Sequence, residues 1–378
     1  MRYHLCFLTA SLALAQGCYR NATREFATPA AIRTARLAER IDSVIQHTMA
    51  ARGIPGAAVA FLRRDTIAVL RGYGVADKSR GTSVTPETIF QIASLTKPFT
   101  AMAVLLLVED GKLDLDAPAV RYLEWLPSRY ANVTVRQLLN HTSGVAPDMR
   151  LQNVDEMSET EFRTRFIERP PSFPAGTGWQ YANAGYTLLS QIVERVSGQS
   201  FGDFLEHRIF APVGMRHTSY RAPARADDQH AVGYDLVDGA LQPAPHVFSG
   251  WGNSGIESTV ADLARWAAAI QRGEILNASS YRAMFTSGRI AGDTALNFPF
   301  REGRSGYGFG WFLMSYHGEP LFTHGGAIAG FSSIFHRLPA REWTVIVLSN
   351  MKQGNDRQGQ AEALAAALLD VLRSEQSP

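Results

Sequence analysis

Apolar residues recur at helical spacing near both ends of the chain. Between Ala31 and Met49 the apolar positions are three or four residues apart, and Gly53 and Pro55 follow shortly after. Because glycine and proline end helices, this pattern predicts a helix that stops before them. The same kind of pattern predicts a second helix over residues 360–372, at the end of the sequence.

Runs of apolar and β-branched residues predict the strands of one sheet. Residues 57–62 and 66–70 are expected to form two strands joined by a short polar tip. After Ser305 four further runs predict successive strands, over residues 307–316, 320–323, 331–338 and 344–348. Because strands and helices come from both ends of the chain, the simplest architecture is an α+β fold, in which an antiparallel sheet packs against the two terminal helices.

The middle of the chain, from about residue 86 to 300, is mostly helical in its periodicity. Loops rich in proline and glycine separate the predicted helices, which cover residues 135–139, 159–167, 186–196, 201–210 and 260–270. We therefore predict one domain over residues 30–378, with a helical subdomain inserted into the sheet. A cleft between the two parts would be a natural binding site.

Composition limits the function classes. The chain has 378 residues, of which 46% are apolar and 19% charged, and a formal net charge of +2. These values are typical of a globular protein, and no run of lysine or arginine points to nucleic acid as a partner. The two cysteines, Cys6 and Cys18, lie near the N-terminus, and the histidines lack HExxH spacing. We therefore expect no cysteine catalysis, no zinc site and no cofactor.

The first residues have the pattern of an export signal. Residues 1–17 contain an apolar run over 5–15 that is too short to span a bilayer as a stable anchor. A small-x-small site at 13–15 would release a soluble protein. Alternatively, the residues before Cys18 resemble a bacterial lipoprotein signal, in which the cysteine is acylated and becomes a lipid anchor. Both alternatives place the protein in the periplasm or cell envelope, with residues 18–29 as a linker.

A serine and a lysine stand three residues apart just before the apolar run 102–108. Proline fits only the first turn of a helix, so Pro98 predicts a helix that starts close to Ser94. Residues i and i+3 share a helix face, with Cβ atoms roughly 5–6 Å apart, which places Lys97 beside the Ser94 oxygen. An amine in that position activates a weak nucleophile. Taken alone, however, the motif also fits a helix N-cap followed by a surface lysine.

Two other serine motifs compete with this one. Ser349 and Lys352 repeat the spacing, but they follow a strand-like run and no helix places them on one face. Residues 198–202 match Gly-x-Ser-x-Gly, the nucleophile elbow of α/β-hydrolases, which requires a strand before it and a helix after it. The segment before this motif is helical in period, so we predict that Ser200 is the N-cap of the next helix.

Two further clusters carry candidate chemistry. Tyr181 and Asn183 lie two residues apart in a loop before a helix, where both side chains can face the same cavity. His324 and the following residues 325–327 lie at a predicted strand boundary, where glycine allows a substrate to approach the backbone and histidine exchanges protons near neutral pH. Ordinary turn chemistry explains each cluster alone. Residues 138–144 are interpreted as a structural helix end.

In this order, the motifs resemble those of the penicillin-recognising serine hydrolases. The chain is similar to the branch that contains class C β-lactamases and DD-peptidases, which also includes D-aminopeptidases and esterases. The likeness covers about residues 35–372 and includes the stretches 111–116, 138–144 and 306–311. The resemblance implies a β-lactamase/transpeptidase-like fold. It also implies a serine hydrolase that forms a covalent acyl-enzyme on peptide, ester or lactam carbonyls of a small-molecule or peptide substrate.

The resemblance implies a role for each side chain. Ser94 would attack the substrate carbonyl, and Lys97 would take or share the serine proton. Tyr181, held as a phenol of low pKa by nearby cations, would be the base in acylation and the acid that protonates the leaving group. Asn183 would donate a hydrogen bond to the amide carbonyl of the substrate.

The glycine-rich strand would supply the rest of the site. The backbone N–H groups of Ser94 and Ala327 would form the oxyanion hole, while Gly325 and Gly326 let the strand edge pair with the substrate. The β-lactamases of this branch carry lysine, a fixed cation, where this chain has His324, and histidine is mostly neutral at pH 7. This departure favours D-peptidase-like or esterase-like chemistry. The alternatives are a true class C β-lactamase and a non-catalytic penicillin-binding sensor.

Two weaker expectations concern the walls of the site. The stretch 211–255 is rich in proline and is expected to shape the pocket, with Trp251 either as a pocket wall or as part of the core. Asn350, at the end of a predicted strand, is expected to face the site.

Overall fold

The computed structural model of the protein describes residues 29–146, 158–221, 227–247, 251–300, 303–352 and 359–375. The predicted export signal, the lipid anchor expected at Cys18 and nearly all of the predicted linker lie outside the described residues. Among the helices that are described, none combines the length and the apolar character that crossing a bilayer requires.

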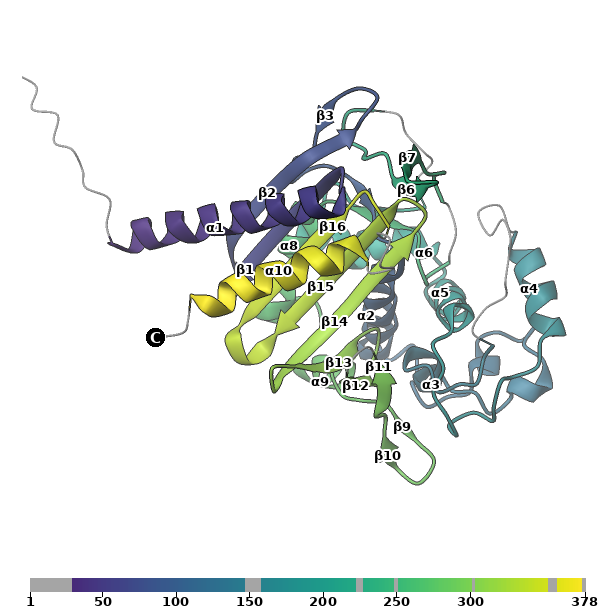
Figure 1. Cartoon of the computed structure of the whole chain (residues 1–378). Coiled ribbons are helices and arrows are strands. Elements are labelled where there is room, and N and C mark those ends of the chain that lie inside the picture. The colour runs from purple at the N-terminus through teal and green to yellow at the C-terminus, as the bar shows by residue number, and fades with distance from the viewer. Residues whose placement is uncertain are drawn as a thin grey trace, which may run out of the picture.

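A large antiparallel sheet is the central layer of the fold (Figure 1). Within the described part of the chain it has nine strands in the order β11-β12-β13-β14-β15-β16-β1-β2-β3. The strands are β1 (Gly56–Arg63), β2 (Thr66–Asp77), β3 (Thr82–Ser83), β11 (Phe298–Phe300), β12 (Gly303–Tyr307), β13 (Phe312–Tyr316), β14 (Glu319–Ile328), β15 (Phe331–Leu338) and β16 (Trp343–Ser349). Strand β1 pairs with β16, so strands from both ends of the chain form one antiparallel sheet, as predicted.

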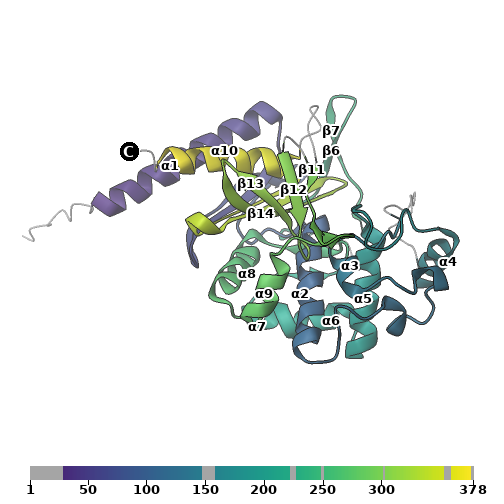
Figure 2. The same ribbon diagram turned by 90° about the horizontal axis from the view of Figure 1, so that it is seen from below.

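Helices cover both faces of this sheet. The terminal helices α1 (Pro29–Arg52) and α10 (Gln360–Ser374) lie across one face, and α2 (Thr96–Glu109), α8 (Val260–Arg272) and α9 (Ala278–Met284) lie on the other (Figures 1 and 2). In β1, Val59 and Phe61 pack in the core under the terminal helices, while Ala60 and Leu62 pack in the core around α2. Both sides of the strand are therefore buried, which explains its continuous apolar run.

Beside the sheet lies the helical part of the chain that the sequence predicted (Figure 1). Its helices are α3 (Val135–Leu139), α4 (Glu159–Glu168), α5 (Asn183–Ser197), α6 (Phe201–Leu205) and α7 (Ala211–Val213), with a π-helical turn over Glu206–Phe210. Short strands connect this part to the rest, namely β4 (Phe90–Gln91), β5 (Ser219–Tyr220), β6 (Tyr234–Val237), β7 (Ala240–Pro243), β8 (Ile256–Ser258), β9 (Arg289–Ile290) and β10 (Thr294–Ala295).

One predicted strand is wrong. The run 307–316 forms two strands, β12 and β13, joined by a tight loop rather than one continuous strand. Gly310 adopts φ +78°, a conformation that favours glycine, and the N–H of Gly308 donates to the carbonyl of Trp311 at 2.9 Å. A Cβ atom on Gly310 would lie 2.9 Å from the Cα of Pro98, so this loop packs closely on the start of α2.

The nucleophile-elbow alternative is excluded by the local structure. Helix α5, not a strand, precedes Ser200. The Ser200 hydroxyl accepts a hydrogen bond from the N–H of Asp203 at 3.1 Å and so caps α6, as predicted.

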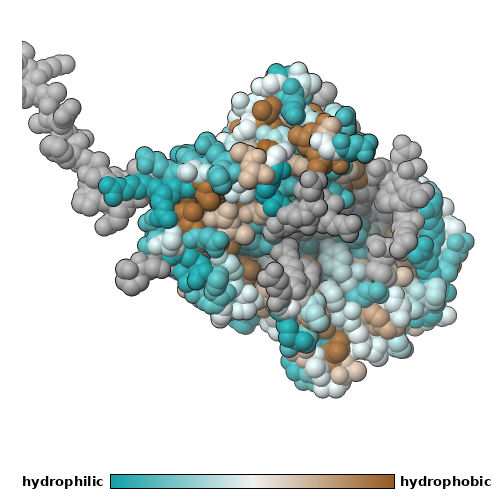
Figure 3. All heavy atoms as spheres, in the orientation of Figure 1, coloured by the Kyte–Doolittle hydropathy of each residue, from teal (hydrophilic) through white to brown (hydrophobic). Residues whose placement is uncertain are grey.

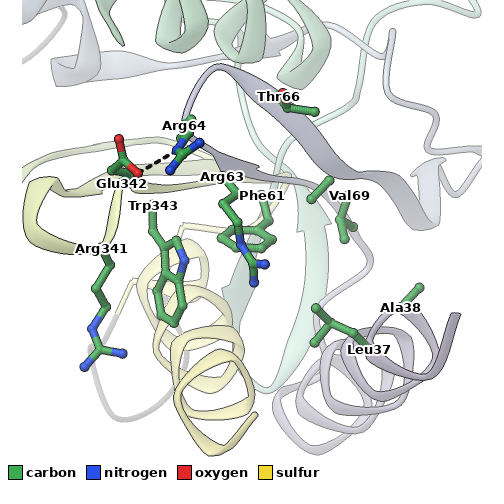
Figure 4. A pocket seen from close by; sticks show the side chains of 11 residues that line it. Leu37, Ala38, Phe61, Arg63, Arg64, Thr66, Val69, Arg341, Glu342 and Trp343 are labelled. Atoms are coloured by element: carbon green, nitrogen blue, oxygen red, sulfur yellow. Dashed lines mark hydrogen bonds and ion pairs between the residues drawn. The ribbon is translucent and has the colours of Figure 1, made fainter. Parts of the chain in front are cut away.

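A groove of about 480 Å³ opens on the side of the terminal helices, between α1, the β1–β2 turn and β16 (Figure 4). Phe61 and Trp343 form its apolar floor, and Arg63 and Arg341 border it. This groove lies on the face of the sheet opposite to α2, so it is separate from the serine and lysine. On this side of the molecule the apolar residues form small groups among hydrophilic ones (Figure 3).

Candidate active site

Ser94 lies where the chain enters a buried helix. A single 3₁₀ turn, Ala93–Leu95, runs directly into α2. Ser94 is partly exposed between buried neighbours, and Ala93 before it has φ +50°, a strained conformation for a residue with a Cβ atom. No side chain caps either helical segment. The helix start is therefore where the sequence predicted it, and the interpretation of Ser94 as a simple N-cap is wrong.

Lys97 is buried in the site instead of lying on the surface. Its side chain is 0% exposed, and its Nζ lies 3.1 Å from Ser94 Oγ. Two further acceptors complete its surroundings: Asn183 Oδ1 at 2.8 Å and the backbone carbonyl of Asn253 at 2.9 Å. The predicted pairing of serine and lysine on one helix face is confirmed by this distance.

Burial of Lys97 favours the neutral amine. The three acceptors fit an ammonium that donates to all of them, or a neutral amine that donates to Asn183 and Asn253 and accepts from the Ser94 hydroxyl. No carboxylate is among the acceptors of Nζ in the described part of the chain. Burial without an opposite charge lowers the pKa of Lys97 well below its usual value. Its nitrogen lone pair is then directed at the Ser94 hydroxyl.

Tyr181 and Asn183 lie on either side of the start of α5. Residue 182 is extended, so the chain brings Tyr181 across the lysine and places Asn183 in the first turn. The Tyr181 ring lies 4.7 Å from Lys97 Nζ and stacks with Phe312. Helices α2 and α5 pack side by side here, which explains why the two motifs meet (Figure 1).

The low pKa expected for Tyr181 is not what the structure gives. Burial raises the pKa of the phenol, and a hydrogen bond with Ser94 lowers it only in part. Burial also lowers the pKa of the neighbouring Lys97, which weakens the cation that was expected to hold Tyr181 as a phenolate. Burial therefore shifts both the Tyr181 phenol and the Lys97 amine toward their neutral forms.

His324 lies inside β14 and not at its boundary, which corrects the predicted position. It is buried, with Nδ1 2.8 Å from the carbonyl of Gly325 and Nε2 3.1 Å from the Tyr307 hydroxyl. The carbonyl only accepts, so Nδ1 carries the proton and Nε2 accepts from Tyr307. Burial lowers the pKa of His324 to about 3, and the charge of Lys97 acts in the same direction. The expectation of a neutral histidine at pH 7 is supported.

His324 is expected to make the free energy of unfolding depend on pH in the acidic range. An unfolded histidine has a pKa of about 6.5, so the unfolded chain binds more protons than the folded one between about pH 6.5 and about pH 3. This contribution to stability is fully present above pH 6.5 and is lost as the pH falls. Between about pH 7 and about pH 4.5, wild type is expected to lose about 2–3 kcal/mol more free energy of unfolding than His324→Gln. Urea unfolding of both proteins at the two pH values measures the difference, and equal losses would contradict it.

Strand β14 carries an unpaired edge toward the site. Strand β13 pairs with it only from Glu319 to Thr323, so residues 324–327 have no strand partner on that side within the described residues. Ala327 is exposed, whereas Gly326 is buried against the chain that leads into Ser94. The predicted glycine-rich strand thus lies next to the serine, with its edge free.

Gly326 lets this strand approach the serine segment. A Cβ atom at this position would lie 2.1 Å from the carbonyl oxygen of Ile92 and 3.0 Å from the Cβ of Ala93, closer than real contacts allow. At Gly325 the added atom would meet Ile334 at 3.0 Å. The close contact between β14 and the residues just before Ser94 therefore depends on glycine at position 326.

Gly326→Ala is expected to lower hydrolytic activity, because the new methyl group forces β14 away from Ser94. Misplacement by about 1 Å costs on the order of 10²-fold in rate, which is the expected fall in kcat/KM for a small ester. Gly303→Ala is the matched control, because a Cβ atom on that glycine of the same sheet meets nothing within 4 Å. An unchanged rate for Gly326→Ala would show that the spacing between β14 and Ser94 is not needed.

Two residues of the site were missed in the sequence. Asn253 supplies its backbone carbonyl to Lys97, and its side chain donates to Thr187 at 3.0 Å. The cluster of glycines around position 253 was the sequence feature that could have indicated this part of the site. His141 is buried beside Tyr181, with ring centroids 4.5 Å apart, and its Nδ1 accepts from the N–H of Ala182 at 3.2 Å. Residues 138–144 do end a helix, and they also support the tyrosine loop.

The two weaker expectations have different outcomes. Trp251 packs against Phe162, with ring centroids 5.6 Å apart, and Arg221 lies over its ring, so it belongs to the packing around the core. Asn350 is fully buried, and its amide donates to three backbone carbonyls, those of Val75, Ala76 and Val232. Asn350 therefore ties the ends of strands together instead of facing the site.

Comparison with known sequences gives one family over most of the chain. The sequence model of the Beta-lactamase family matches residues 41–369. Penicillin-binding protein 4* of Bacillus subtilis (strain 168) is 30% identical over 313 residues, which are 75% of this chain and 65% of that protein. Protein flp of Staphylococcus aureus (strain MRSA252) is 25% identical over 324 residues, 83% of this chain and 63% of that protein. The chain thus spans just under two thirds of the length of these curated relatives.

Solved structures show the same fold. The octameric penicillin-binding protein homologue from Pyrococcus abyssi superposes with a TM-score of 0.77 at 29% identity, over 89% of this chain and 77% of that one. D-amino acid amidase from Ochrobactrum anthropi SV3, complexed with L-phenylalanine, superposes with a TM-score of 0.76 at 26% identity, over 90% and 99%. The predicted β-lactamase/transpeptidase-like fold is confirmed.

Proposed function

Because this chain belongs to the β-lactamase family of serine hydrolases, we propose that it hydrolyses peptide, amide or ester carbonyls through a covalent acyl-enzyme on Ser94. The observation that carries the proposal is the surroundings of Lys97: a buried amine 3.1 Å from Ser94 Oγ, held in place by two carbonyl oxygens. A structural lysine would need a carboxylate partner to justify its burial. A base for the serine proton explains the arrangement instead.

In acylation, Ser94 Oγ attacks the carbonyl carbon while its proton passes to Lys97 Nζ. The bond to the leaving group then breaks, and the leaving atom takes the phenol proton of Tyr181. Lys97 returns its extra proton to the phenolate, so the net transfer is from serine to the leaving group. A neutral Tyr181 suits this donor role, and such proton transfers contribute typically about 10²–10⁴ in rate. In deacylation water attacks the acyl-enzyme by the reverse route.

Backbone and amide groups complete the proposed machinery. The Asn183 oxygen accepts from Lys97, which leaves its amide N–H₂ as the group available to a substrate carbonyl. The N–H groups of Ser94 and Ala327 form the proposed oxyanion hole, where a lost donor costs roughly 10²–10³ in rate. The free edge of β14 at residues 324–327 would pair with an extended substrate.

His324 supports D-peptidase-like or esterase-like chemistry over a true β-lactamase. It is neutral and its ring nitrogens are already engaged, so it offers no fixed cation to a substrate carboxylate. The similarity to D-amino acid amidase and to penicillin-binding proteins is compatible with this choice. We also propose export through residues 1–17, with Cys18 as the lipid anchor if the lipoprotein signal is the one used.

Intact-protein mass after mixing with a penicillin, and separately with a p-nitrophenyl ester, tests the proposal. Ester turnover without a lasting penicillin adduct or penicillin hydrolysis is expected. A lasting adduct would indicate a DD-peptidase-like site with slow deacylation, and hydrolysed penicillin would indicate a β-lactamase. If neither reagent is turned over or forms an adduct, the protein is a non-catalytic module and the proposal fails.

His324→Lys is expected to raise reactivity toward substrates that carry a carboxylate, because it introduces a cation where histidine is neutral. The measurement compares kcat/KM for a carboxylate-bearing ester and its neutral methyl-ester analogue, in wild type and variant. We expect the ratio to rise by about tenfold, the value of one charge-assisted hydrogen bond. The same ratio in both proteins would show that position 324 does not contact the carboxylate.

A further inference from the structure

A second cavity adjoins the serine segment. It has a volume of about 120 Å³ and is bordered by Gln91, His230, His246, Glu257 and Phe331, among others. Pockets that hold drug-sized ligands measure roughly 300–1,000 Å³, so this cavity fits a functional group on a chain and not a whole ligand. The described side chains around it do not converge in a way that could hold a metal ion.

The cavity contains a buried acceptor without a donor. Only 5% of the Glu257 side chain is exposed, and Oε1 lies 2.7 Å from His246 Nε2. Its other oxygen, Oε2, has no hydrogen-bond partner among the described residues. A buried carboxylate oxygen that lacks a donor is costly, so a ligand that donates here would gain binding energy.

A second hydrogen-bond acceptor, on His230, lies close to Glu257 Oε2. Asp227 lies 2.7 Å from His230 Nδ1, and a carboxylate only accepts, so Nδ1 carries the ring proton. In the neutral ring, Nε2 is then an acceptor, and it lies 3.9 Å from Glu257 Oε2. A nitrogen donor about 2.8 Å from each atom fits between them. A primary ammonium group supplies both hydrogen bonds, and its positive charge is attracted by the Glu257 carboxylate.

The backbone connects this cavity to the proposed reaction centre. Gln91 lies three residues before Ser94 and is the cross-strand partner of Glu257, and Phe331 is paired with Ile328, next to Ala327. Three extended residues span about 10 Å, so the backbone of Gln91, which borders the cavity, lies within that distance of the serine. Asn253, which binds Lys97, begins the segment that leads into β8 and Glu257.

The direction of the substrate follows from the same strand. Tyr181, the proposed donor to the leaving group, lies beside His324, at one end of the free edge 324–327. The cavity lies beyond the other end, next to Ile328 and Phe331. We propose that Glu257 and His230 bind a primary ammonium group on the acyl part of the substrate, several bonds from the scissile carbonyl. This inference rests on the proposed hydrolase function and names its substrate class.

Two p-nitrophenyl esters test the inference. The 6-aminohexanoate ester carries an ammonium at the end of five methylene groups, about 7–8 Å from the carbonyl carbon, and the heptanoate ester has a methyl group in its place. For each protein, the kcat/KM for the amino ester is divided by the kcat/KM for the heptanoate ester. This ratio is expected to be at least about tenfold higher in wild type than in Glu257→Gln, mainly through KM. Glu206→Gln, which removes an exposed glutamate from the π-helical turn, is the matched control and should leave the ratio unchanged.

The outcomes separate this inference from the proposed function. Equal ratios in wild type and Glu257→Gln overturn the ammonium site while leaving the hydrolase intact. If Glu257→Gln does not fold, His230→Phe removes the second acceptor and gives the same comparison. Calorimetric binding of n-hexylammonium to Ser94→Ala, with and without Glu257→Gln, tests the cavity without turnover: binding lost in the double variant supports the site, and unchanged or absent binding overturns it. Undiminished ester turnover by Ser94→Ala would instead refute the proposed function.

Discussion

Replacing Ser94 with alanine is expected to lower kcat/KM for a p-nitrophenyl ester by at least about 10⁴-fold, since loss of the nucleophile removes the covalent route entirely. The fold should persist, because the Ser94 hydroxyl caps no helix and its chief contact is with Lys97. Stopped-flow or plate-reader assays of purified wild type and variant measure the loss. Circular dichroism and thermal unfolding show that the variant remains folded.

The chain offers matched serine controls. Ser200→Ala removes the cap of α6 and should cost about 1 kcal/mol of stability without loss of activity. Ser349→Ala, in the second Ser-x-x-Lys match, lies in β16 and should also retain activity. If Ser94→Ala turns over the ester as fast as wild type, the nucleophile lies elsewhere, and the variant among these that loses activity would identify it.

Lys97→Met is expected to lower kcat/KM by about 10²–10⁴-fold, because it removes the base while keeping the length of the side chain. Burial lowers the pKa of Lys97, so the wild-type rate should fall on acidification as the amine takes up a proton. The variant should lack this acidic limb. Measurement of kcat/KM against pH for both proteins checks the size of the loss and the missing limb.

Stability separates a catalytic from a structural role for this lysine. Lys97→Met leaves two buried carbonyl oxygens without a donor, at about 1–3 kcal/mol each, but it also removes the cost of burying an amine. We therefore expect a far larger effect on rate than on unfolding. Lys112→Met, on an exposed lysine, is the matched control. A Lys97→Met protein that unfolds but keeps its specific activity when folded would contradict the proposed role.

Much of the fold could be predicted from the sequence, because turns and helix ends depend on residues close together in the chain. The sequence predicted β1, β2, α1 and the start of α2 because their boundaries depend on nearby residues. These are the polar turn after Leu62, Gly53 at the end of α1 and Pro98 in the first turn of α2. The prediction of one strand over 307–316 failed because the turn within it depends on Gly310, which has a positive φ and packs against the start of α2, where a Cβ atom would not fit. A long-range contact of this kind leaves no periodic signal in the sequence.

The sequence by itself determined the order of the motifs, the helix that presents Ser94 and Lys97, and the antiparallel sheet built from both ends of the chain, because periodicity and turn residues act locally. Only the tertiary structure decided the ionisation of the site. Burial lowers the pKa values of Lys97 and His324 and raises the pKa of Tyr181, and burial depends on every segment packed around these groups. The cavity at Glu257 likewise exists only because β4, β8 and β15, which are far apart along the chain, meet beside the serine.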